Sequence, residues 1–530
     1  MSTRVKPYLP GATAIITVAL ALLLLPWLGE TFFYSKGEPR EAIVGMSIVE
    51  SGNWILPLNY GGDIPFKPPF LGWLIAIFAY IFNGGEVNEY ISRLPSALAA
   101  FAMVMGGYFW ARRERDSRFA ILFAFVTITT FEVFRAALAC RLDMVLTACM
   151  VGAIYLMYHI REHKTRFKGL LYVAVVLLLS CATLTKGPIG SLLPCFIIGV
   201  YRLFRHDSFF PTLGKMLTLA ILSLILPAWW FYTAYQQGGS HFYDLMMEEN
   251  FGRLLGTMSY ESHENPIWYN FVSLIAGLLP WTVLLIAGCF SLRRVHATPL
   301  KPAGLLCAVA AVIVVVFYSI PESKRAVYLL PAYPFICYGI ASILDYRASS
   351  GAVRFFAWFM AIIAVIAPLA IAALQIWPQP KLTLCPVPWW GYIVLALPLS
   401  AGIAWMMNRH SAPGHLCVIV WALFVAYAAV GMPTVLNPKS DKKLTERLAT
   451  TPPATVVTLG KTRQYSLNFY MHDALRNVPT VTDAEQYPSG TKMVFGNDAD
   501  TTGISRTFEV DTLTARSADY RGPLFIATKK

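Results

Sequence analysis

Long apolar runs separated by short polar segments dominate this chain. A transmembrane helix needs about 20 mainly apolar residues, and about 13 runs approach that length. The expected spans are 11–29, 93–111, 119–138, 143–160, 168–184, 187–204, 214–233, 267–290, 302–320, 325–345, 354–375, 387–407 and 413–432. The pattern predicts a mainly α, polytopic membrane protein. The first run resembles a signal peptide because Arg4 and Lys6 precede it, but no small-residue cleavage site follows, which favours an uncleaved anchor.

Two segments between the expected spans, 30–92 and 234–266, are too long to be simple connections, and long loops in compact proteins are usually functional. In the first, Glu41–Glu50 reads as a short amphipathic helix that begins at Pro39 and ends near Ser51 and Gly52. The apolar stretch Pro69–Phe82 is too short to span a bilayer comfortably, so we expect an interfacial or re-entrant helix.

The hydrophobic pattern changes at Pro433, where short β-rich runs begin to alternate with helical stretches. Strands are expected at Ala454–Leu459, Thr491–Phe495, Thr507–Val510 and Leu524–Ala527, and helices at Asp441–Ala449 and Arg463–Met471. We therefore predict two domains, a transmembrane domain over residues 1–432 and a small outer α/β domain over residues 433–530.

Composition supports the membrane assignment. Of 530 residues, 56% are hydrophobic and only 14% are charged, with a mean hydropathy of +0.54. These values exclude a disordered, collagen-like or disulfide-stapled chain and disfavour a single soluble globule. The nine cysteines form no CxxC pair, which disfavours both a metal knuckle and a disulfide framework.

The formal net charge of +13 is distributed unevenly. With the N-terminus inside, the inner segments carry 19 basic and 5 acidic residues, whereas the outer segments before residue 433 carry 11 basic and 15 acidic residues. This distribution obeys the positive-inside rule. It predicts a cytoplasmic N-terminus and an outer tail, and it gives no support to a nucleic-acid partner.

Polar residues that composition alone would not place near a membrane surface gather on the outer face. They are Glu38, Arg40, Asp63, Lys67, Asp143 (with Arg141), Lys186, Glu248, Glu249, Arg253, His263, Lys324, Arg325 and Tyr328. Cations at a lipid–water boundary suit a phosphate or pyrophosphate, which they bind and then stabilise as a leaving group. Lys186 is the strongest phosphate ligand, because we expect Gly187 and Pro188 to start a helix whose N–H groups face the anion. Glu38 is a candidate general base and Asp143 a candidate for orienting substrate.

Each of these residues also has a purely structural interpretation. Lys324 and Arg325 can be side chains that reach from a span end to water. Glu249 can belong to a solvated loop, His263 can be a packed histidine, and Tyr328 can belong to the interfacial aromatic belt.

The motifs, taken in order, resemble those of a known family. They are Gly37-Glu38-Pro39-Arg40-Glu41, Ser51-Gly52-Asn53-Trp54, Lys67-Pro68-Pro69, Ser92-Arg93-Leu94-Pro95-Ser96, Arg141-Leu142-Asp143, Thr185-Lys186-Gly187 and Lys324 with Tyr328-Leu329-Leu330-Pro331. This set resembles the ArnT-like lipid A aminoarabinose transferases, which are polyprenyl-phosphate-dependent membrane glycosyltransferases of the GT-C type. The likeness covers about residues 10–345.

The resemblance implies an inverting transfer of a sugar from a polyprenyl-phosphate lipid to an acceptor on the periplasmic side of a bacterial inner membrane. The sugar would be 4-amino-4-deoxy-L-arabinose and the acceptor lipid A or a related envelope glycolipid. By position, Lys67 matches a lysine that grips the lipid phosphate. Asp143, Lys186, Arg253 and Tyr328 match residues that line the donor-phosphate cavity.

This sequence departs from the family pattern at two positions. Gly37 stands where the family often has Asp, so the role of the first outer loop falls to Glu38 alone or is shared with Glu41 or Asp63. Phe66 stands where the family usually has an acidic or polar residue, which weakens the case for a metal at that position. Participation of a divalent cation stays open, as do the sugar, the acceptor and the oligomeric state.

Three alternatives remain. One is an enzyme of the same superfamily that resembles the protein O-mannosyltransferases and glycosylates a protein hydroxyl. Another is a lipid-sugar transporter or flippase, although transporters place charged sites near the bilayer midplane, often in repeated folds, and no internal repeat is visible. The third is an envelope scaffold that uses the outer tail for binding.

Overall fold

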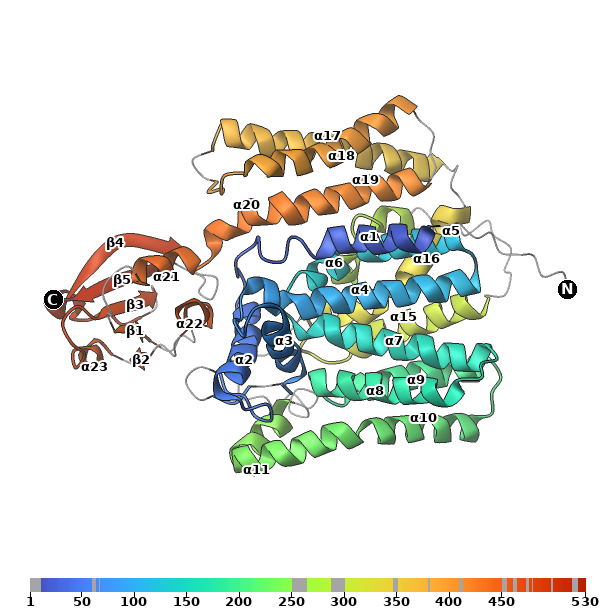
Figure 1. Ribbon diagram of the computed structural model, residues 1–530, viewed down its shortest axis with the longest axis horizontal. Coiled ribbons are helices and arrows are strands. Elements are labelled where there is room, and N and C mark those ends of the chain that lie inside the picture. The colour runs from blue at the N-terminus through green and yellow to red at the C-terminus, as the bar shows by residue number, and fades with distance from the viewer. Residues whose placement is uncertain are drawn as a thin grey trace.

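The computed structural model consists of a bundle of long helices with a small mixed sheet beyond one end of it (Figure 1). It describes residues 11–59, 63–65, 67–249, 265–286, 301–346, 351–379, 382–408, 413–449, 455–460, 465–472, 476–478, 480–496, 499–516 and 523–530. The first described helix begins at the end of the bundle opposite the sheet (Figure 1).

The long helices run side by side along the bundle. They are α1 (Ala12–Leu24), α4 (Glu89–Glu114), α5 (Ser117–Ile128), α7 (Leu142–Glu162), α8 (Lys168–Lys186), α9 (Ile189–Phe204), α10 (Phe209–Ser223), α11 (Ile225–Met247), α15 (Pro302–Ser319), α16 (Tyr333–Tyr346), α17 (Gly351–Ile376), α18 (Trp389–Asn408) and α19 (Pro413–Ala426). Shorter elements are α2 (Gly37–Ser51), α3 (Phe70–Phe82), α6 (Phe131–Ala137), α13 (Tyr269–Gly277), η2 (Ala326–Ala332), η3 (Tyr427–Gly431), α20 (Met432–Leu436) and η4 (Asn437–Lys439).

In the part of the chain that the structure describes, nine helical segments are long and apolar enough to cross a membrane, or ten if α5 and α6 form one bent span. The predicted multi-span, mainly helical architecture is therefore confirmed. The expected spans 11–29 and 187–204 correspond to the shorter helices α1 and α9, and 267–290 corresponds in part to α13. The total of 13 spans stays a prediction.

The predicted span 119–138 is broken rather than straight, because α5 and α6 meet at an angle of 69°. Polar groups stabilise the break inside the bundle, where water is scarce. The Phe131 N–H donates to the Leu279 carbonyl at 2.9 Å. The Trp281 indole N–H donates to the Thr129 hydroxyl at 3.0 Å, while that hydroxyl donates back to the Phe125 carbonyl.

The first long segment between expected spans, residues 30–92, contains the two predicted helices, α2 and α3, which lie at the sheet end of the bundle. α2 begins two residues before Pro39 and ends at Gly52, whose φ of 68° is the left-handed conformation that favours glycine at a helix end. The two helices approach closely at Gly45, where a Cβ would lie 2.5 Å from Ile75 Cγ2. α3 has 13 residues, which is consistent with a helix that does not cross the bilayer.

The tail forms a five-stranded sheet in the order β2-β1-β3-β5-β4. Its strands are β1 (Val456–Leu459), β2 (Arg476–Val478), β3 (Lys492–Gly496), β4 (Phe508–Arg516) and β5 (Pro523–Lys529), and its helices are α21 (Lys442–Ala449), α22 (Tyr465–Met471), α23 (Val481–Ala484) and α24 (Ile504–Thr507). β1 pairs in parallel with β2 and β3, whereas β5 pairs antiparallel with β3 and β4. The four predicted strands and two predicted helices are present, and the three-residue strand β2 was not anticipated.

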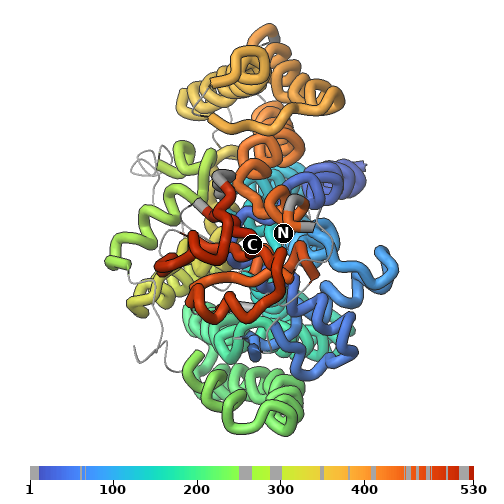
Figure 2. The backbone as a smooth tube through the Cα atoms, turned by 90° about the vertical axis from the view of Figure 1, so that its left-hand side faces the viewer, coloured from blue at the N-terminus to red at the C-terminus, as the bar shows by residue number. Residues whose placement is uncertain are grey.

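The tail packs against the helical bundle through α22, and Figure 2 shows the sheet in front of the middle of the bundle. Tyr465 and Phe469 of α22 join a buried cluster with Ala42, Ile43 and other residues of α2. The Tyr470 hydroxyl accepts a hydrogen bond from the Phe33 N–H at 2.9 Å. α22 therefore lies beside the elements that carry the candidate site.

Candidate active site

The end of the bundle nearest the sheet brings together the start of α7, the end of α8 and η2. Asp143 lies in the first turn of α7, Lys186 is the last residue of α8, and Tyr328 lies in η2. The Lys186 ammonium donates to Asp143 Oδ1 at 2.5 Å and lies 4.1 Å from the centroid of the Tyr328 ring. Three residues far apart in the sequence thus form one contact group, which we call the Asp143 cluster (Asp143, Lys186 and Tyr328).

The sequence interpretation placed Lys186 at the opening of a helix, and the structure corrects this. Gly187 has a φ of 89°, and its N–H donates to the Thr183 carbonyl at 2.7 Å, so it ends α8 directly after Lys186. The next helix begins only at Ile189. Lys186 therefore reaches Asp143 from a helix C-terminus, where a cation is favoured.

A second group of charges lies around a small pocket of about 20 Å³ between α2 and α3. Arg40 donates to Glu41 Oε1 at 2.6 Å, and Lys67 donates to Glu249 Oε2. Burial lowers the pKa of Arg40, but Glu41, Tyr465 and Glu249 outweigh that effect and hold the pKa above its ordinary value. We call Arg40, Glu41, Lys67 and Glu249 the Lys67 cluster.

The two clusters are neighbours. Leu142 lines the pocket of the Lys67 cluster, and Asp143 follows it in the first turn of α7. Together they place two lysine–carboxylate pairs at the same end of an apolar bundle. Such an arrangement has the charges needed to bind a lipid phosphate and to accept a proton nearby.

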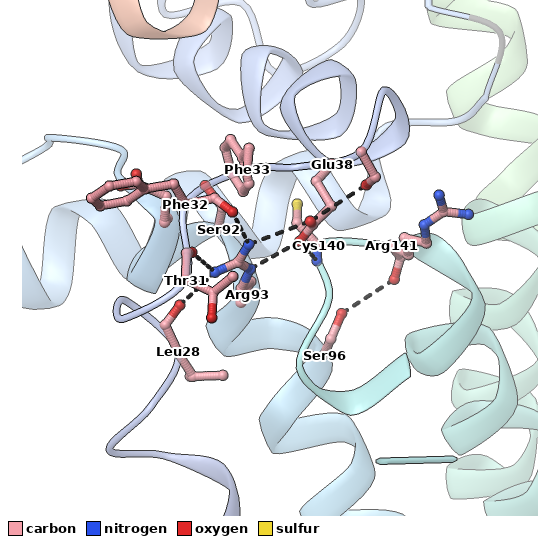
Figure 3. A network of polar contacts seen from close by, with 12 residues as sticks. Leu28, Thr31, Phe32, Phe33, Glu38, Ser92, Arg93, Ser96, Cys140 and Arg141 are labelled. Atoms are coloured by element: carbon pink, nitrogen blue, oxygen red, sulfur yellow. Dashed lines mark hydrogen bonds and ion pairs between the residues drawn. The ribbon is translucent and has the colours of Figure 1, made fainter. Parts of the chain in front are cut away.

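Glu38 lies outside this pocket, in a buried network between α2 and α4 (Figure 3). Its side chain is 1% exposed, and Arg93 donates to both of its oxygens, at 2.8 and 3.3 Å. The Cys140 N–H donates to Glu38 Oε1 at 3.1 Å, and Arg93 also donates to the backbone carbonyls of Leu28 and Thr31. Its carboxylate is thus fully engaged by protein groups.

Burial has a clear effect on the groups around this network. It raises the pKa of Tyr34 to about 12, and the nearby charge of Glu38 acts in the same direction. It also raises the pKa of the Cys140 thiol well above its ordinary value, again with help from Glu38. Both side chains therefore remain neutral at physiological pH.

The remaining predicted cations have different surroundings. Lys324 is buried and donates to the Asn265 carbonyl at 3.0 Å, while the Asn265 amide donates back to the Lys324 carbonyl at 3.0 Å. These hydrogen bonds connect Asn265, at the end of the long segment 234–266, to the residues just before η2. Arg325 follows it and interacts electrostatically with Asp143.

Three further candidates remain. The side chain of Asp63 is exposed, and its carbonyl accepts from the Asn59 N–H at 2.8 Å. Arg253 and His263 lie outside the described residues. The described residues contain no group of three or more His, Cys, Asp or Glu side chains that could hold a metal ion.

Sequence reasoning assigned no site role to several residues that prove to be close to these clusters. Arg93 neutralises Glu38. Glu132 and Arg135 form an ion pair at 2.5 Å on α6, and Arg135 interacts electrostatically with Asp143. The sequence signal for this pair was the spacing of the two residues, because an acidic and a basic residue three positions apart lie on the same face of a helix.

Comparisons with known proteins agree with this geometry. The Dolichyl-phosphate-mannose-protein mannosyltransferase family profile matches residues 66–231. An undecaprenyl phosphate-alpha-4-amino-4-deoxy-L-arabinose arabinosyl transferase of Aeromonas salmonicida is 25% identical over 446 residues, covering 81% of this chain and 77% of that protein. A relative of the same description from Shewanella sediminis is 27% identical over 340 residues, covering 62% of this chain and 59% of its own length.

Among solved structures, the crystal structure of ArnT from Cupriavidus metallidurans bound to undecaprenyl phosphate matches with a TM-score of 0.74. The match covers 98% of each chain at 21% sequence identity. The chain thus has an ArnT-like GT-C fold, and the resemblance expected from the motifs is confirmed.

Proposed function

We propose that this chain is an inverting membrane glycosyltransferase that moves a sugar from a polyprenyl-phosphate donor to lipid A or a related envelope glycolipid. The site lies on the periplasmic face of a bacterial inner membrane. The observation that carries the proposal is the meeting of the Lys186–Asp143 and Lys67–Glu249 pairs at one end of an apolar bundle. That bundle has the fold of a protein crystallised with undecaprenyl phosphate.

The two lysines bind the donor phosphate, with support from Lys324, Arg325, Tyr328 and, in the second long loop, Arg253. An entering phosphate draws the Lys186 ammonium away from Asp143, which leaves that carboxylate able to accept a proton. The acceptor oxygen then attacks the anomeric carbon as its proton passes to Asp143. The bond from the sugar to the phosphate oxygen breaks, and polyprenyl phosphate leaves with the electron pair, stabilised by the cations.

Glu38, the first sequence candidate for the base, is better suited to a positioning role. A general base needs to reach the acceptor proton, whereas both oxygens of Glu38 accept hydrogen bonds from Arg93 inside the protein. We assign Glu38 to fixing the start of α2. Glu41 then stands in the pocket as a second carboxylate beside Arg40.

An apolar groove of about 540 Å³ offers a place for the polyprenyl chain. Its lining includes Pro188, Phe231, Tyr235 and Met246. Because Pro188 follows Lys186 by two residues, a chain in this groove would bring its phosphate end near the Asp143 cluster. Most of the side chains that line this groove are aromatic or otherwise apolar.

The sugar is most simply 4-amino-4-deoxy-L-arabinose, which the names of the two transferase relatives carry. A second candidate is mannosyl transfer to a protein hydroxyl, which the family profile over residues 66–231 favours. The outer tail, residues 433–530, contributes α22 beside α2 and is a candidate for shaping the acceptor entrance.

The test uses the purified full-length chain in detergent with undecaprenyl-phosphate-linked aminoarabinose and lipid A. Release of undecaprenyl phosphate and the mass of lipid A are both measured, with a mannosyl donor and a peptide acceptor in parallel. Asp143→Asn and Lys186→Ala are expected to lower turnover roughly 100-fold or more. Lys36→Ala, which alters an exposed lysine at the same end, is the matched control.

Wild-type turnover in both Asp143→Asn and Lys186→Ala, each with an unchanged unfolding temperature, would refute the site assignment. Transport of the lipid across a vesicle membrane without sugar transfer would instead identify a flippase.

A further inference from the structure

Arg141 occupies an unusual place between the two charged clusters. It caps the N-terminal end of α7, two residues before Asp143, and its side chain is half-buried. Its carbonyl accepts from the Ser96 hydroxyl at 3.2 Å. Within the described part of the chain, however, its guanidinium has no hydrogen bond and no ion pair, and Figure 3 shows it directed away from the Glu38–Arg93 pair.

The neighbouring cations are all compensated. Lys186 binds Asp143, Lys67 binds Glu249, and Arg40 binds Glu41. A half-buried guanidinium that donates no hydrogen bond loses part of its hydration. Among the described residues, Arg141 interacts electrostatically with Asp143, which already pairs with Lys186. Arg141 therefore has the unused hydrogen-bonding capacity that a substrate anion would satisfy.

Gly37 explains why the guanidinium can lie where it does. A Cβ at position 37 would lie 3.0 Å from Arg141 Nη2 and 3.3 Å from its Cζ, so Arg141 fills the place that a side chain would take. Gly37 is also the first residue of the 15-residue helix α2. The positive end of this helix and the guanidinium both favour an anion, and Glu38, the acidic residue in the first turn of α2, is already paired with Arg93.

We propose that the guanidinium of Arg141, beside Gly37, binds a phosphate group of the lipid substrate. This inference rests on the proposed function and adds to it a phosphate ligand, Arg141, to which the family resemblance assigned no role. A guanidinium suits this task because two of its N–H groups match two phosphate oxygens in one plane. The donor lipid and the acceptor glycolipid both carry phosphate, so the chemistry is shared and the experiment separates the two sources.

The first experiment measures equilibrium binding of three probes to the purified chain in detergent. The probes are undecaprenyl phosphate, lipid A and inorganic phosphate. Arg141→Ala is expected to weaken binding of at least one of the two lipids by about 10-fold to 100-fold, and Arg141→Lys by less, because a point charge replaces a bidentate contact. If Arg141→Ala weakens binding of undecaprenyl phosphate alone, Arg141 binds the phosphate of the donor. If it weakens binding of lipid A alone, Arg141 binds a phosphate of the acceptor.

The second experiment changes Gly37, the neighbour of Arg141, and separates the effect of a negative charge there from the effect of an added side chain. Gly37→Asp places a carboxylate against Arg141, whereas Gly37→Asn adds a side chain of the same size without the charge. An acidic residue is also favoured in the first turn of α2, so Gly37→Asp should fold. We expect Gly37→Asp to weaken lipid binding as strongly as Arg141→Ala, and Gly37→Asn to weaken it several-fold less.

Three results overturn the inference. Arg141→Ala with wild-type affinity for both lipids would do so, and so would equal losses for Gly37→Asp and Gly37→Asn. If either result accompanies normal wild-type sugar transfer, the inference fails while the proposed function stands. A wild-type chain that neither binds the two lipids nor transfers sugar refutes both, and an unchanged unfolding temperature of each variant excludes loss of fold as the cause.

Discussion

At the scale of single residues, the Glu38–Arg93 pair provides a test that separates positioning from catalysis. Both side chains are almost completely buried, with exposures of 1% and 2%. Glu38→Gln removes one charge and leaves Arg93 uncompensated, which typically costs about 3–5 kcal/mol. We expect a large drop in unfolding temperature. Asp143→Asn should cost less, because 15% of the Lys186 side chain and 13% of the Asp143 side chain are exposed, so water can still solvate the Lys186 ammonium in the variant. Thermal unfolding in detergent measures both.

The control for this prediction changes both partners together. Glu38→Gln with Arg93→Gln removes both charges, so it should recover part of the stability that Glu38→Gln loses. If Glu38→Gln instead kept its wild-type unfolding temperature but lost sugar transfer, Glu38 would be catalytic and its assignment to positioning would be wrong.

At the scale of secondary-structure elements, the approach of α2 to α3 depends on a glycine. A Cβ at Gly45 would lie 2.5 Å from Ile75 Cγ2, closer than side chains tolerate. Gly45→Ala is therefore expected to destabilise the protein by about 1–3 kcal/mol, despite the higher helix propensity of alanine. Gly106→Ala, within α4 and with no atom near its Cβ position, is the matched control. It should leave stability unchanged or raise it, and equal unfolding temperatures for the two variants would contradict the packing argument.

The contact between α22 and α2 gives a second prediction at this scale. Phe469 is 3% exposed, and its ring centroid lies 4.8 Å from that of Phe33. Phe469→Ala should cost about 3–5 kcal/mol locally, because it leaves a cavity at the contact. Tyr470→Phe should cost about 1 kcal/mol, since it loses the hydrogen bond from the Phe33 N–H.

Limited proteolysis of the full chain measures this effect. We expect faster cleavage in the tail of Phe469→Ala and an unchanged rate in the helical bundle. Equal rates of tail cleavage in Phe469→Ala and wild type would show that α22 is not held by this contact.

Elements were predictable from the sequence where the local pattern was long or strongly marked. The length of the apolar runs predicted the long helices, and Gly52 marked the end of α2. β2 was missed because three residues, Arg476–Val478, carry no visible alternation. Lys186 was assigned to the wrong helix because a glycine followed by a proline is compatible with either a helix end or a helix start. Only the backbone of Gly187 decides between them.

The charged residues of the site were recognisable by type but not by partner. Lys186 lies 43 residues from Asp143, and Lys67 lies 182 residues from Glu249. Such pairings depend on which helices become neighbours, and apolar runs alone do not specify that. The same limit applies to Glu38. Its position beside Pro39 suggests a catalytic role, whereas its buried pairing with Arg93 supports our proposal that it has a positioning role.

At the scale of the whole molecule, the two ends of the bundle differ in their chemistry. The end opposite the sheet carries ion pairs rich in arginine, including Arg115 with Asp345 and Arg161 with Asp207, each at 2.6 Å. The end nearest the sheet carries the Asp143 and Lys67 clusters. If the positive-inside rule holds, the arginine-rich end is cytoplasmic, and the sheet and both clusters face the periplasm.

Reporter fusions decide this orientation. Alkaline phosphatase folds only outside the cytoplasm, so a fusion after Lys530 should be active and a fusion at Thr165, between α7 and α8, should be inactive. A fluorescent protein that fails to mature in the periplasm should give the opposite pattern at the same two positions. Phosphatase activity at Thr165 with none after Lys530 would invert the topology. The charged clusters would then face the cytoplasm, and an acceptor in the outer envelope could not reach them, so the orientation and the proposed acceptor stand or fall together.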